Sequence, residues 1–157
     1  MIRYTVNSRT SLLNMPWYVT SLTVTGNTCN DNNLYVVDLS PFKLLRSVVI
    51  GNSCFKYVSV FSIEGLNWLE YVTINFNCFT EDCSGGSSFE GSHFHIVNCP
   101  RLRSLYIGYC SFSRYNGFEL AQLPQLQTIS VGDYYYRGSV SFGGTTEAVF
   151  KGGDSCD

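Results

Sequence analysis

The chain has 157 residues, of which 45% are hydrophobic and only 14% are charged, and its net charge is −2. These values argue against a nucleic-acid-binding protein, because too few cations are present to neutralise a run of phosphates. The hydrophobic content excludes a disordered chain, and no apolar run is long enough to span a bilayer. We therefore expect a single folded domain over residues 1–157.

A pattern of eleven positions recurs five times along the chain, after an N-terminal partial unit near residues 12–16. The first copy runs from Val19 to Cys29, and the others begin at Leu45, Leu69, Leu102 and Leu126. All five fit L-x-x-L-x-L-x-x-N/C-x-L, with β-branched and aromatic residues in place of some leucines. The alternation inside each copy predicts a short strand with one buried face.

A second apolar pattern follows each of these copies. It reads Φ-x-Φ-x-x-Φ, where Φ is apolar, and it begins at Val37, Phe61, Phe94 and Phe118, with a decayed copy at Val140-x-Phe142. The alternation predicts a second strand per unit, and no helical period intervenes. Because such a unit cannot bury its apolar face alone, we expect the units to stack over about residues 10–142.

Two segments depart from this register. Residues 80–92 are rich in Gly and Ser and form an insertion, which we expect to be a surface loop. Residues 143–157 are small, polar and acidic, and we expect a tail. Neither end carries an evident cap, so the ends are candidates for contact with another molecule.

Together these patterns resemble those of leucine-rich repeat proteins. Phe-rich units such as Ser47–Phe55 (SVVIGNSCF) are similar to repeats in large protist proteins and, more loosely, in bacterial surface antigens. The resemblance implies a solenoid, and the two patterns together predict that it is mainly β, with about five coils of about 24 residues and two short strands per coil. It also implies a non-catalytic module for recognition or scaffolding. A strand in place of the usual helix predicts a straighter solenoid, without a deep groove.

The predicted binding face consists of side chains that point outward from the first strand of each unit. Aromatic residues gather there on two adjacent units, among small polar residues, and Tyr combines apolar area with a hydrogen-bonding tip. Such a face suits a protein or a glycan, although cross-strand aromatic pairing for stability alone is the alternative. The predicted face comprises Tyr71, Phe76, Tyr106, Tyr109, Thr73 and Asn75.

The seven cysteines divide by position in the pattern. Cys29, Cys99 and Cys110 fall at inward positions, where Cys acts as a small apolar residue. Cys54 and Cys78 share one position in consecutive units, about 4.8 Å apart if the units stack, so a disulfide between them is possible under oxidising conditions. Its competitors are a Cys78–Cys83 bridge and fully reduced thiols.

Chemistry at a reactive site has little support in the sequence. Cys83, His93, His95 and Cys99 do not follow a standard zinc spacing, so we expect no metal. Neither histidine is tied to a nucleophile by a motif, so we expect no catalytic residues, no enzyme and no cofactor.

The expected partner is therefore a protein, or a second copy that joins the solenoid ends into fibres or extended arrays. We expect no nucleic acid and no membrane span. The compartment stays open, with the cell surface or the exterior preferred over the cytoplasm.

Overall fold

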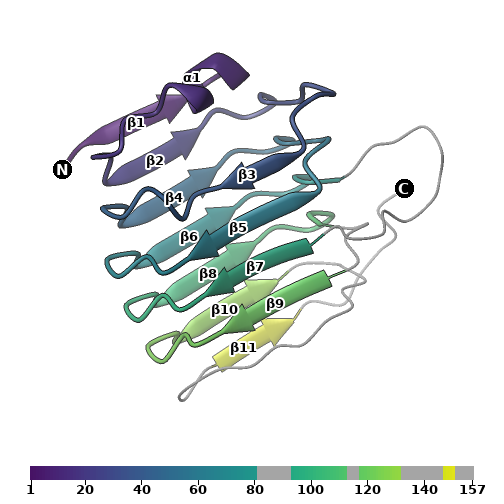
Figure 1. Cartoon of the computed structure of the whole chain (residues 1–157). Helices are drawn as coiled ribbons and strands as arrows, with labels where there is room; N and C mark the ends of the chain where they lie inside the picture. Colours follow the sequence, from purple (N-terminus) through teal and green to yellow (C-terminus); the bar gives the residue numbers. More distant parts are fainter. Residues whose placement is uncertain (81–92, 113–116, 132–146, 151–157) are drawn as a thin grey trace.

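The computed structural model describes residues 1–80, 93–112, 117–131 and 147–150, and in these the chain is mainly β, as the alternating patterns predict (Figure 1). Two parallel sheets face one another across the core. The larger sheet has the strand order β1-β2-β4-β6-β8-β10-β11, and the smaller sheet has the order β3-β5-β7-β9.

The strands are short in both sheets. Those of the larger sheet are β1 (Arg3–Val6), β2 (Ser21–Val24), β4 (Ser47–Ile50), β6 (Tyr71–Ile74), β8 (Ser104–Ile107), β10 (Thr128–Val131) and β11 (Glu147–Phe150). Those of the smaller sheet are β3 (Val36–Asp38), β5 (Val60–Glu64), β7 (His93–Val97) and β9 (Gly117–Ala121). One helix, α1 (Arg9–Leu13), lies between β1 and β2 in the sequence.

From β2 to β10 the chain alternates between the sheets, and equivalent pattern positions pair with one another. Leu22 pairs with Val48, and Val48 pairs with Val72. In the smaller sheet Phe61 pairs with Phe94. We call the segment from one strand of the larger sheet to the next a unit. The first pattern thus supplies strands of the larger sheet, and the second pattern supplies the smaller sheet.

Stacked phenylalanines fill the space between the two sheets. The rings of Phe55, Phe79 and Phe112 stack in sequence, with centroids 5.1 and 4.5 Å apart. Phe61 and Phe94 stack at 5.5 Å, and Phe61 meets Phe79 edge-on at 4.9 Å. All five rings are buried, so the two stacks form one continuous aromatic core, in which such pairs add to the hydrophobic term.

The turns that leave β2, β4, β6 and β8 each place two residues in the left-handed region. The φ values lie between 53° and 62° at Asn27, Cys29, Ser53, Phe55, Asn77, Phe79, Cys110 and Phe112. Asn adopts this conformation readily, but for Phe it is uncommon and costs about 1–2 kcal/mol. The second left-handed residue directs its side chain inward, which is how Phe79 and its equivalents reach the core.

Backbone hydrogen bonds between units hold these turns in both directions. The amide of Asn77 donates to the carbonyl of Tyr109 in the next unit, at 2.9 Å. The amide of Phe79 donates to the carbonyl of Cys54 in the previous unit, at 3.0 Å. Ser53 and Phe55 make the equivalent bonds. The strained backbone is therefore stabilised by the neighbouring units rather than by its own sequence.

The N-terminal segment differs from the expected partial unit. Arg3–Val6 forms β1 and pairs in register with β2, and α1 packs beside β1. Ser8 begins the helix with a capping box, in which its hydroxyl accepts from the amide of Ser11. These short elements were missed because they lie outside the recurring pattern. At the other end, β11 falls inside the segment expected to be a tail, and it pairs with β10.

Some sequence predictions concern residues outside the described ranges. They include the insertion loop beyond Thr80, the decayed pattern at Val140-x-Phe142 and most of the segment 143–157. Among the described residues, no helix is both long and apolar enough to cross a membrane.

Close stacking at the end of the larger-sheet strands predicts unequal tolerance of alanine at two glycines. A Cβ on Gly108 would lie 2.5 Å from the backbone nitrogen of Phe76, whereas one on Gly26 meets nothing nearer than 3.4 Å. We expect Gly108→Ala to lower the free energy of unfolding by about 2 kcal/mol or more, and Gly26→Ala to change it by less than about 0.5 kcal/mol. Urea denaturation measures both, and equal effects would contradict the packing described.

Candidate functional site

The four predicted aromatic residues are all exposed, and they lie on the outer side of the larger sheet. We call Tyr71, Phe76, Tyr106 and Tyr109 the aromatic face. Tyr71 and Tyr106 stand on neighbouring strands, β6 and β8, offset by two positions in register. Phe76 and Tyr109 lie just beyond the same strands and stack with centroids 4.9 Å apart and planes 1° from parallel. The structure thus brings Phe76 and Tyr109 into contact and places Tyr71 and Tyr106 on neighbouring strands of the same two units.

The two smaller residues predicted with this face have different surroundings. Thr73 is half-buried on β6, where it pairs with Tyr106. The side-chain amide of Asn75 donates to the carbonyl of Ile50 at 2.8 Å. Asn75 therefore links two units, and its amide nitrogen is already committed to the backbone.

The sequence analysis missed a second exposed group beside the aromatic face. Trp68, in the turn before β6, is 40% exposed. The guanidinium carbons of Arg101 and Arg46 lie 4.2 and 5.5 Å from its ring centroid. Each of the three residues comes from a different unit, so the sequence shows only isolated charges. Their shared position in the repeat could have indicated this contact, since Trp68 and Arg101 each directly precede the leucine that opens a copy of the first pattern.

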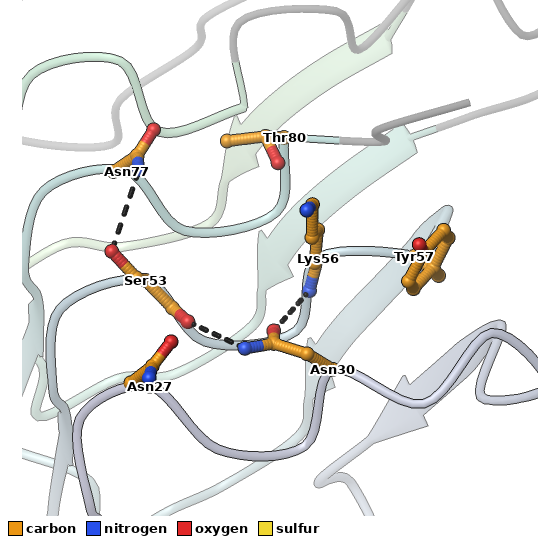
Figure 2. A pocket seen from close by; sticks show the side chains of 7 residues that line it. All are labelled: Asn27, Asn30, Ser53, Lys56, Tyr57, Asn77 and Thr80. Carbon is orange, nitrogen blue, oxygen red and sulfur yellow. Dashed lines mark hydrogen bonds between the residues drawn. The ribbon is translucent and has the colours of Figure 1, made fainter. Parts of the chain in front are cut away.

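A polar hollow of about 320 Å³ lies along the edge formed by the left-handed turns (Figure 2). Three successive units contribute its lining, which consists of Asn27, Asn30, Ser53, Lys56, Tyr57, Asn77 and Thr80. Asn30 links the first two units, because its amide donates to the Ser53 carbonyl and accepts from the Lys56 backbone amide, both at 2.9 Å. Asn77 reaches the Ser53 hydroxyl at 3.4 Å.

This hollow has the size of a small ligand site and offers hydroxyl, amide and ammonium groups. Among the described residues, its lining contains no carboxylate, imidazole or thiol, so these seven residues do not bring together an acid–base pair or a nucleophile with a base. The best-placed amide, that of Asn30, is used to join two units. The described lining therefore offers hydrogen-bonding groups that suit a polar ligand.

Cys54 and Cys78 are buried free thiols, so the disulfide proposed from their spacing is not formed in this structure. Each thiol instead donates to a backbone carbonyl of the preceding unit, Cys54 to Thr25 at 3.1 Å and Cys78 to Gly51 at 3.0 Å. Hydrogen bonding with Cys54 and burial both raise the pKa of Cys78. The competing Cys78–Cys83 bridge is also not formed, since Cys78 is free.

Of the remaining described cysteines, two are free thiols and one is in a disulfide. Cys29 and Cys99 are buried thiols, as their inward positions predict. Burial raises the pKa of Cys29 from 9.0 to about 11, and burial also raises that of Cys99. Cys110 was expected in the core, but it is only half-buried and takes part in a disulfide.

The histidines lie side by side on the outer face of the smaller sheet. The rings of His93 and His95 stack at 5.4 Å, and the Nε2 of His95 lies 3.9 Å from a carboxylate oxygen of Glu64. Cys99 is buried in the core rather than beside them. Within the described ranges, no three His, Cys, Asp or Glu residues converge to hold a metal ion.

No family model matches the chain, and no curated protein or solved structure was found to be similar to it.

The raised pKa of Cys29 predicts a loss of stability at alkaline pH. The unfolded thiol ionises near pH 9.0, but the folded thiol stays neutral until about pH 11. Its contribution is complete below pH 9 and is lost as pH rises toward 11, because the unfolded state then releases a proton that the folded state keeps. We expect the wild type to lose more unfolding free energy over this range than Cys29→Ala. Parallel urea titrations at several pH values measure this, and identical slopes would contradict it.

Proposed function

We propose that this chain is a leucine-rich-repeat solenoid whose aromatic face recognises a protein partner without catalysis. The observation that carries the recognition role is the exposure of four aromatic side chains on two adjacent units, at 36–51%. The alternation of the chain between two sheets, with equivalent residues paired at each step, supports the solenoid. A rigid sheet is a suitable platform, because it holds the rings in place before a partner arrives.

Three features of the aromatic face favour a protein partner. The rings are large and have few rotatable bonds, so little side-chain entropy is lost when they are covered. Hydroxyl groups from Ser47 and Ser104 flank Tyr71 along the sheet, which supplies polar contacts at the rim. The stacked Phe76–Tyr109 pair adds a flat apolar area at the strand ends. A glycan would use the same rings by stacking and is the alternative occupant.

Substitution of the two tyrosines on β6 and β8 tests whether the aromatic face binds a protein partner. We expect Tyr71→Ser combined with Tyr106→Ser to reduce partner capture by the immobilised chain at least about tenfold, as loss of central aromatic contacts does at interfaces. Quantitative mass spectrometry of captured proteins measures the change. Tyr35→Ser is the matched control, because Tyr35 is an exposed tyrosine, at 58%, but lies beside β3 of the other sheet. Capture that is unchanged in the double variant, or equally lost in the control, would refute the role of this face.

A second function, head-to-tail or edge-to-edge assembly, is favoured by one observation. Among the described residues β3 pairs only with β5, so one edge of the smaller sheet carries unpaired backbone groups. Tyr35 and Val36, which lie at that edge, are both more than half exposed. Exposed strand edges of this kind promote association between chains.

Charge at this edge provides the test of assembly. If copies join there, the wild type elutes earlier in size-exclusion chromatography as its concentration rises, and Val36→Lys abolishes the shift, since edge lysines block strand pairing. Val49→Lys is a control, because Val49 is also an exposed strand residue but lies in the middle of the larger sheet. A chain that stays monomeric at all concentrations would exclude assembly as the function.

A further inference from the structure

A cluster of three arginines and one tryptophan stands apart from the residues already assigned to recognition. We call Arg46, Trp68, Arg101 and Arg103 the arginine corner. All four are exposed and lie at the amino-terminal ends of β4, β6 and β8. Seven Lys and Arg residues occur in the described part of the chain, and three of them are gathered here, in a protein with a net charge of −2.

Backbone hydrogen bonds align Arg46 and Arg103 on neighbouring units, and the indole ring of Trp68 contacts the guanidiniums of Arg46 and Arg101. The carbonyl of Arg46 accepts from the amide of Glu70 at 2.8 Å, and the carbonyl of Glu70 accepts from the amide of Arg103 at 2.8 Å. These three residues are therefore successive rungs of one ladder. The ring of Trp68 contacts two of the three side chains, because the guanidiniums of Arg46 and Arg101 both lie within 5.5 Å of its centroid. Guanidinium groups in such contacts keep their N–H edges available for hydrogen bonds.

None of the three arginines forms an ion pair with a carboxylate among the described residues. Glu70 lies between Arg46 and Arg103 on the ladder, but its carboxylate is not within ion-pair distance of either. The exposed carboxylates of Asp38, Glu64 and Glu119 belong to the other sheet. Among the described residues, the corner therefore carries a local excess of positive charge, with three arginines around the single carboxylate of Glu70 and no ion pair between them.

We propose that the arginine corner binds a short acidic segment of the protein partner. This inference rests on the proposed function, and it names the chemistry of the partner that the aromatic face alone leaves open. Guanidinium groups pair with carboxylates through two parallel hydrogen bonds, and these charge-assisted bonds are the strongest of their kind. Tyr71 opens β6, three residues after Trp68, so the corner lies at the amino-terminal end of a strand that carries the aromatic face.

Charge distribution favours a short acidic peptide over a long polyanion. Exposed charges act over about 8–10 Å at moderate salt, so a short segment experiences mainly the corner. A nucleic acid, a polyuronate or an anionic membrane extends further and also meets the negative charge of the rest of the chain. Three arginines can pair with only a small part of such a polymer's charge, whereas they can pair with all of the two or three carboxylates on a short peptide.

The test uses the full chain, a fluorescein-labelled hexaglutamate peptide and a Trp17→Phe background in which Trp68 is the only tryptophan. We expect saturable binding by fluorescence anisotropy, with a parallel change in Trp68 emission that places the peptide at the corner. Arg46→Gln combined with Arg101→Gln should weaken binding at least about tenfold, because charge-assisted bonds are lost. The affinity of the wild type should also fall between about 50 and about 300 mM NaCl.

Lys56→Gln is the matched control, since Lys56 also lies over an aromatic ring, 6.0 Å from the centroid of Tyr57, but at the turn edge. It should bind hexaglutamate as the wild type does. All the substituted side chains lie outside the core, and circular dichroism verifies that each variant is folded. Binding that is absent, or equally strong in the double arginine variant, overturns the proposal.

Other occupants give distinct results, each of which also overturns it. Polygalacturonate or phosphatidylserine vesicles would bind in place of the peptide, or the chain would dimerise at low salt through the same arginines. If hexaglutamate fails while partner capture still depends on Tyr71 and Tyr106, only the acidic partner is wrong. If capture is independent of those tyrosines as well, the proposed function falls with it.

Discussion

The units that begin at β4 and β6 are held by the units on either side, through the left-handed turns that follow these strands. A residue such as Phe79 adopts a positive φ that its side chain disfavours. It keeps this conformation because its amide bonds backward at 3.0 Å and the amide of Asn77 bonds forward at 2.9 Å. The same turn delivers the Phe79 ring to the aromatic core. Backbone hydrogen bonding and core packing therefore depend on a single local geometry.

The surfaces proposed for recognition are consequences of this stacking. Equivalent positions of neighbouring units lie on adjacent parallel strands, about 4.8 Å apart, so side chains distant in the sequence become neighbours. Trp68 and Arg101 meet in this way, and so do Phe76 and Tyr109. Gly108 contributes by its lack of a side chain, because it lets the turns approach closely beside the Phe76–Tyr109 pair. The strand register that stacks the units for stability therefore also places the recognition side chains next to one another.

Much of the fold could be predicted from the sequence, because burial on one side of a strand imposes an alternation that is easily read. Leu22 and Val24, or Val48 and Ile50, follow this rule, and their strands lie where it places them. The left-handed Phe55 and Phe79 could not be predicted, since Phe rarely adopts positive φ and only neighbouring units make it favourable. Exposure of the aromatic face follows from the alternation. The arginine corner does not, because it requires knowing which turns lie side by side.

Cysteine chemistry shows a further limit of sequence reasoning. The spacing of Cys54 and Cys78 is compatible with a disulfide, but spacing does not reveal that backbone carbonyls of the preceding unit accept hydrogen bonds from both thiols. Ser111 occupies the equivalent position one unit later, and its hydroxyl bonds to the carbonyl of Asn75 at 2.7 Å. The position thus selects a small hydrogen-bond donor, which explains why both Cys and Ser occur there.

Native-state hydrogen exchange at the amides of Asn77 and Phe79 tests the central claim most directly. If the left-handed turns are held by their neighbours, these amides should exchange only through global unfolding, with free energies of exchange that match the stability measured by urea. The amide of Asn33, an exposed residue in a polar turn, should exchange freely in the same experiment. Exchange at Asn77 and Phe79 as fast as at Asn33 would contradict the account.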